Sequence, residues 1–96
     1  MEEENKKSNK FMPPLDITSL LVPFYTQALI KLGEMEDPLS GEKDEDINFA
    51  KRLIDLIELF EKKTKGNLIQ EEEKFVESIL HNLRMLYLKK ANIIKI

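Results

Sequence analysis

Residues 47–67, which read INFAKRLIDLIELFEKKTKGN, are the stretch that most constrains the fold of this chain. Their apolar residues recur at the spacing of an α-helix, with acidic residues just before the stretch and Gly66 near its end, where helices begin and end. The stripe consists of Ile47, Phe49, Ala50, Leu53, Ile54, Leu56, Ile57 and Phe60, with Leu59 outside it. This stripe covers roughly half of the circumference, whereas a helix with one covered side needs an arc of about 100°. The segment therefore predicts a helix that is covered on more than one side.

A second apolar helix is predicted over residues 17–32, because Asp16 is a capping residue and Gly33 allows the left-handed turn that ends a helix. Pro23 interrupts this helix, since it has no N–H group and its ring crowds the carbonyl of Ser19. The helix therefore either bends at Pro23 or begins later, near Val22. Its apolar arc again covers roughly half of the circumference, so it too must be covered on two sides.

A third helix is predicted over residues 68–90, with Asn67 as its N-cap and Gln70 three residues later in a capping-box arrangement. Its stripe consists of Phe75, Val76, Ile79, Leu80, Leu83, Leu86 and Tyr87. Because only a few residues separate it from the preceding helix, these two helices form an antiparallel hairpin. The sequence thus predicts an all-α fold of three helices that ends in a hairpin and is completed by oligomerisation.

The length of 96 residues suits one domain, which we place at residues 15–90. Its helices are expected at about 17–32, 47–64 and 68–90. Residues 1–14 are charged and end in two prolines, which predicts a disordered N-terminal tail. The C-terminal tail, residues 91–96, extends the last helix, docks across the bundle or stays loose.

The charge and composition of the chain exclude several classes of function. A net charge of −3 with only two arginines, Arg52 and Arg84, argues against binding of nucleic acid, which needs clustered cations. The chain has no cysteine, so disulfides and thiolate metal sites are excluded. No apolar run approaches the about 20 residues that span a bilayer, and no secretory signal is visible. We expect a cytoplasmic protein without a membrane span.

Candidate chemical sites are weak, and we assign no catalytic residue and no cofactor. The acidic stretch at residues 34–46 lacks the spacing of a calcium loop, and its last three residues, Asp44 to Asp46, are better explained as caps of the following helix. His81, the single histidine, follows Glu77 by one helical turn, which is half of a zinc site. A solvated histidine paired with Glu77 explains this spacing better than a metal ligand does.

Several short motifs stand in a familiar order. They are TQALIKLG at residues 26–33, DP followed by GEK at residues 37–43, LIDLIELFEKKTKGNL at residues 53–68 and LRMLY at residues 83–87. With them the chain resembles a bacterial family of short uncharacterised proteins, the domain of unknown function numbered eighteen-forty-four. The resemblance implies a bacterial, cytoplasmic, mainly helical protein and provides no functional residues. The chain departs from it at Ile69, where a capping threonine is expected, and at Pro23.

The excess of apolar surface is the main functional signal. Three short helices cover one another only in part, so self-association through the first helix and part of the second is the function we predict. The expected interface residues are Leu20, Leu21, Phe24, Tyr25, Leu29, Leu59, Met85 and Leu88. One alternative is an adapter that binds an amphipathic helix of a partner protein. The alternative that the sequence supports least is a small enzyme with a site at an oligomer interface around Glu77 and His81.

Overall fold

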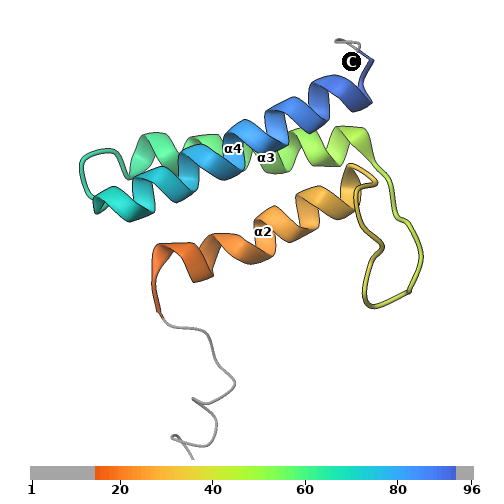
Figure 1. Cartoon of the computed structure of the whole chain (residues 1–96), viewed down its shortest axis with the longest axis horizontal. Coiled ribbons are helices and arrows are strands. Elements are labelled where there is room, and N and C mark those ends of the chain that lie inside the picture. Colours follow the sequence, from red (N-terminus) through yellow and green to blue (C-terminus); the bar gives the residue numbers. More distant parts are fainter. Residues whose placement is uncertain (1–14, 93–96) are drawn as a thin grey trace, which may run out of the picture.

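The computed structural model describes residues 15–92, and within them the chain forms three α-helices and no strand. The helices are α2 (Ile17–Lys31), α3 (Ile47–Lys63) and α4 (Gln70–Lys90). A short turn joins α3 to α4, and the two run antiparallel to each other, with α2 beside them (Figure 1). The predicted all-α fold with three helices and a C-terminal hairpin is confirmed. The predicted tail at residues 1–14 and the last four residues lie outside the described part.

Helix α2 begins after Asp16, whose carboxylate accepts a hydrogen bond of 2.8 Å from the N–H of Ser19. The helix continues through Pro23, so a start near Val22 is wrong. At the other end Gly33 adopts a φ of +80°, and the N–H groups of Gly33 and Glu34 return to carbonyls of the last turn. This arrangement satisfies carbonyl groups that the end of a helix leaves without partners.

The connection between α2 and α3 leaves the bundle and returns to it at one place. The N–H of Asp46 donates to the carbonyl of Lys31 over 2.8 Å, so the end of α2 and the start of α3 are tied by their backbones. The carboxylate of Asp46 accepts from the N–H of Phe49, as an N-cap does. The neighbouring acids have other partners, since Asp44 pairs with Lys31 and Glu45 pairs with Lys90 of α4. Only Asp46 of the three predicted caps therefore caps α3.

The start of α4 differs from the prediction. The helix begins at Gln70, and its N-cap is Ile69 rather than Asn67. An isoleucine side chain accepts no hydrogen bond, so only half of a capping box is present, in which Glu72 accepts from the N–H of Ile69 over 3.1 Å. Three glutamates in the first turn stabilise this end through the helix dipole instead. At the other end, α4 stops at Lys90 and Asn92 has a φ of +62°, so residues 91–92 do not extend the helix.

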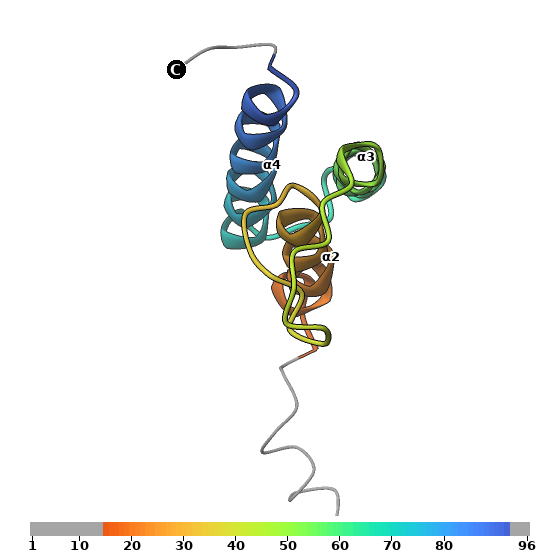
Figure 2. The ribbon, with the colours of Figure 1, turned by 90° about the vertical axis from the view of Figure 1, so that its right-hand side faces the viewer.

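The core lies where the three helices meet. It consists of Leu21, Ala28, Leu32, Ala50, Leu53, Ile54, Ile57, Val76, Ile79, Leu80 and Leu83. Two polar contacts link the helices around it. Arg84 of α4 pairs with Glu58 of α3 over 2.6 Å, and the amide of Asn82 on α4 donates to the hydroxyl of Tyr25 on α2 over the same distance. Figure 2 looks along α3 and shows α2 and α4 at two positions around it, which leaves part of its circumference without a helical neighbour.

Candidate protein-binding groove

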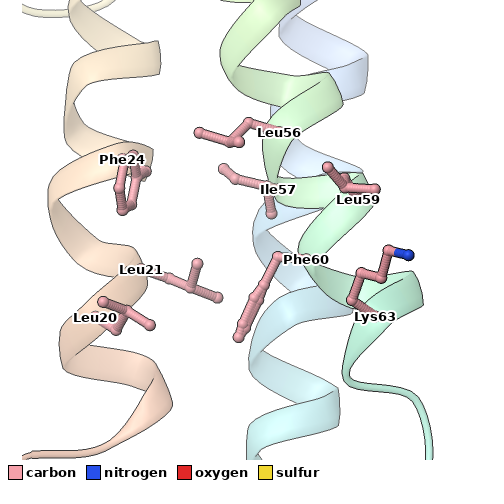
Figure 3. Close-up of a pocket in the computed structure, with 8 residues that line it drawn as sticks. All are labelled: Leu20, Leu21, Phe24, Leu56, Ile57, Leu59, Phe60 and Lys63. Atoms are coloured by element: carbon pink, nitrogen blue, oxygen red, sulfur yellow. The ribbon is translucent and has the colours of Figure 1, made fainter.

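An apolar groove of about 360 Å³ lies between α2 and α3 (Figure 3). Its lining residues are Leu20, Leu21 and Phe24 from α2 and Leu56, Ile57, Leu59, Phe60 and Lys63 from α3. Leu21 and Phe60 point into the space between the two helices, whereas Leu59 and Lys63 lie at its outer edge. Lys63 is the only lining residue with a charged side chain.

The floor of the groove is closed and its rim is open to solvent. Leu21 and Ile57 are only 3% and 1% exposed, because they also belong to the core. The rim residues Leu20, Leu59 and Leu56 are 55%, 50% and 44% exposed, and Phe24 is 37% exposed. A single exposed leucine is ordinary on a protein surface, but several large apolar side chains around one concavity are typical of a binding surface.

The path of α2 explains why the groove is open. The backbone bond between Lys31 and Asp46 holds α2 close to α3 at one end, and the two helices diverge towards the start of α2 (Figure 1). Leu20 and Phe24 lie in the diverging half, so their side chains do not reach full contact with α3. The groove is thus a consequence of two wide apolar arcs that meet fully at only one end.

The charges next to the groove are cationic. Lys63 follows Leu59 by four residues, and Arg52 precedes Leu56 by four residues, so both lie on the same stripe of α3 as the rim leucines. Both side chains are exposed, and within residues 15–92 neither one takes part in an ion pair. The stripe of α3 that borders the groove therefore has an apolar middle and a cation towards each end.

Other polar residues of α3 lie away from the groove. Lys51 donates to both carboxylate oxygens of Asp55, at 2.8 and 3.0 Å, and this hydrogen bond raises the pKa of Lys51. Both residues line a second depression, between α3 and α4, together with Leu88. The α2–α3 groove itself is lined by apolar side chains with Lys63 at its edge, so its lining suits the binding of an apolar surface.

The structure separates the interface residues that the sequence predicts. Leu20, Phe24 and Leu59 meet at the rim of the groove, and Leu21 lies in its floor. Tyr25 and Leu29 pack against the core of the same chain.

The two predicted interface residues on α4 lie elsewhere. Met85 is 39% exposed and does not line the groove, and Leu88 lines the second depression. One rim residue, Leu56, belongs to the main stripe of α3 and is not among the predicted interface residues. The width of that stripe was the signal that some of its members stay exposed.

Glu77 and His81 are both exposed on α4, and no ion pair between them is present in the described part of the chain. The predicted pairing of the two side chains is therefore absent. Residues 15–92 also contain no cluster of three or more histidine or acidic side chains arranged to hold a metal ion. In the same residues no helix is long and apolar enough to cross a bilayer.

Comparison with protein families gives a match over residues 14–89 to a model described as a domain of unknown function (DUF1844). This match contains all four motifs on which the resemblance was based. Comparison with curated proteins finds no match, and comparison with solved structures finds none either.

Proposed function

The chain belongs to the family defined by the domain of unknown function DUF1844, and we propose that it is a protein–protein interaction module that binds through the α2–α3 groove. The observation that carries this proposal is the convergence of four partly exposed large apolar side chains on one groove with a closed floor. Full burial of a leucine or phenylalanine contributes about 1.5–3 kcal/mol, and these side chains are about half buried already. Covering the rim would therefore contribute about 1 kcal/mol for each of them.

Self-association is the first form of this proposal. The groove of one copy would face the groove of the other, in the symmetric arrangement that is usual for homodimers. Light scattering during size-exclusion chromatography, repeated over a range of protein concentrations, tests this form. This form predicts a dimer or higher oligomer at micromolar concentration, and a monomer throughout would contradict it.

A double variant locates the interface. Leu56→Gln with Leu59→Gln places amides at the rim and leaves the buried residues of α3 unchanged, so the chain still folds. If self-association uses the groove, the oligomer should dissociate in this variant. Met85→Gln is the matched control, because Met85 is exposed to a similar extent on α4 and does not line the groove. An oligomer that is weakened equally by both changes would place the interface elsewhere.

An adapter is the second form, and the shape of the groove supports it. Two antiparallel helices with an apolar trough between them can accept an amphipathic helix of another protein through its apolar face. Titration of the labelled full chain with a synthetic amphipathic helix tests this form. We expect shifts of amide resonances at the rim, and shifts confined to α4 would contradict it.

The cytoplasmic location and the lack of nucleic-acid binding stay predictions of the sequence. Fractionation of the source cells tests the first. A filter-binding measurement with duplex and single-stranded oligonucleotides at low salt tests the second.

A further inference from the structure

We infer that the occupant of the α2–α3 groove is an acidic amphipathic helix of another protein, with a carboxylate near each end of its apolar face. This inference rests on the adapter form of the proposed function and adds the charge of the partner to it. The observations that carry it are Lys63 in the lining of the groove, Arg52 one helical turn beyond the lining residue Leu56, and the apolar rim between these two cations.

The stripe of α3 beside the groove reads Arg52, Leu56, Leu59 and Lys63, at successive steps of four, three and four residues. Side chains at this spacing lie along one side of a helix. With a rise of 1.5 Å per residue, the α-carbons of the two cations are about 16 Å apart along the axis, which corresponds to about three turns. A partner helix that lies along the groove would meet both cations with carboxylates about three turns apart and place its apolar residues between them.

In the part of the chain that the structure describes, these two cations have no ion-pair partner, whereas two other charged residues, on α2 and at its cap, have polar partners. Lys31 of α2 pairs with Asp44, and its Nζ atom lies 5.3 Å from the centre of the Phe49 ring. The carboxylate of Asp16, at the start of α2, already accepts a hydrogen bond from the N–H of Ser19. Arg52 and Lys63 form no ion pair within residues 15–92, although the chain as a whole has a net charge of −3.

The same charges disfavour a second copy and a lipid surface as occupants. In a two-fold dimer with antiparallel α3 helices, the Arg52 end of one copy would face the Lys63 end of the other, and like charges would meet at both ends. A groove is concave and receives a convex helix, whereas a bilayer is flat and is attracted by larger clusters of cations than these two. The observations therefore favour a helical protein segment with negative charge.

Three synthetic probes with the same leucine face test this inference against the full chain. Each probe has two flanking positions about three turns apart, which are glutamate in the first, glutamine in the second and lysine in the third. Fluorescence anisotropy at low and high salt reports the affinities. We expect the glutamate probe to bind about fivefold more tightly than the glutamine probe at low salt, because two exposed ion pairs form. The lysine probe should bind most weakly, and added salt should remove the differences.

A charge variant of the protein completes the test. In Arg52→Gln with Lys63→Gln, the glutamate and glutamine probes should bind equally well, while the affinity for the glutamine probe stays unchanged. Arg84→Gln is the matched control, because Arg84 lies on α4, away from the stripe of α3 that borders the groove, and pairs with Glu58. It should leave the selectivity intact. Circular dichroism checks that all variants keep their helices.

The outcomes separate this inference from the proposed function. Equal binding of all three probes would overturn the acidic partner and leave the interaction module standing. If no probe binds and the protein is a monomer, both the inference and the proposed function are contradicted. A stable dimer that closes the groove would identify a second copy as the occupant and overturn the inference. Binding to vesicles that contain anionic lipid, without binding to the glutamate probe, would also overturn it.

Discussion

Both ends of α2 are apolar in sequence, but their exposure to solvent differs greatly in the structure. At the C-terminal end Ala28 and Leu32 have no exposed surface and Ile30 is 3% exposed. At the N-terminal end Leu20 is 55% exposed, and Leu21 is the only residue of its first two turns that is buried. The difference shows that the composition of a helix does not decide how much of it is covered. The positions of its neighbours decide that.

Specific links hold the C-terminal end in place. The chain leaves α2 through the turn at Gly33, and the hydrogen bond from the N–H of Asp46 to the carbonyl of Lys31 brings it back to the end of the helix. The ion pair of Glu45 with Lys90 connects the same region to α4. In the described part of the chain, the only hydrogen bond that holds the first turn of α2 from a side chain is its own cap at Asp16, and the bond from Asn82 of α4 reaches the helix only at its middle, at Tyr25. The C-terminal end of α2 is therefore fixed against the other helices, and the N-terminal end forms one wall of the groove.

The largest expected effect is at the closed end. Leu32→Ala removes a side chain with no exposed surface and leaves a cavity in the core, which should lower the free energy of unfolding by about 2–5 kcal/mol. Leu20→Ala at the open end should lower it by less than about 1 kcal/mol, because more than half of that side chain is already in water. Chemical denaturation of both variants measures the contrast. Equal losses would show that the groove is closed in solution.

A change in the turn after α2 should have the next largest effect. Gly33→Ala imposes a positive φ on alanine and brings its Cβ against the carboxylate of Glu45, so we expect a loss of about 2 kcal/mol. Gly41→Ala is the control, since Gly41 also has a positive φ but faces open space, and about 1 kcal/mol should be lost. Thermal unfolding distinguishes the two. A smaller loss for Gly33→Ala would contradict the tight packing of this corner.

A smaller effect is expected from the cap at the open end. Asp16→Ala removes the acceptor for the N–H of Ser19, which should cost about 1 kcal/mol. Hydrogen exchange should become faster in the first turns of α2, while the amides at Leu32 and Gly33 stay protected. Faster exchange along the whole helix would show that its two ends unfold as one unit.

The smallest effect is expected on the polar face of α3, away from both ends of α2. Asp55→Asn removes the hydrogen bond that raises the pKa of Lys51, so this pKa should fall towards its ordinary value in a titration followed by NMR. A raised lysine pKa contributes stability below the unfolded value of 10.5, and this contribution is lost as the pH rises through the folded pKa. The variant should therefore lose this pH dependence above pH 10.5 and keep α2 unchanged. An unchanged pKa of Lys51 would contradict the hydrogen bond between Lys51 and Asp55 as the cause of the raised pKa.

Sequence reasoning identified the elements whose signals are local. The cap at Asp16, the left-handed turn at Gly33 and the apolar stripes depend on neighbouring residues, and the structure contains all of them. The cap of α4 was misplaced because Ile69 is a poor capping residue, and the position is fixed by Glu72 and the helix dipole instead. Leu56 is missing from the predicted interface because periodicity defines an apolar arc but does not say which part of it receives a neighbour. The groove depends on the divergence of two helices, which no local pattern encodes.

The connection between α2 and α3 has a practical consequence. Because the N–H of Asp46 reaches the carbonyl of Lys31, the chain between them starts and finishes at one point of the bundle. Its own bonds, such as the N–H of Gly41 to the carbonyl of Asp37, lie within the loop, and Leu39 at its tip is almost fully exposed. Such a tip is suited to new chain ends or to an inserted reporter domain. A fluorescent domain placed between Leu39 and Ser40 would thus report on the protein in living cells while both walls of the groove stay free.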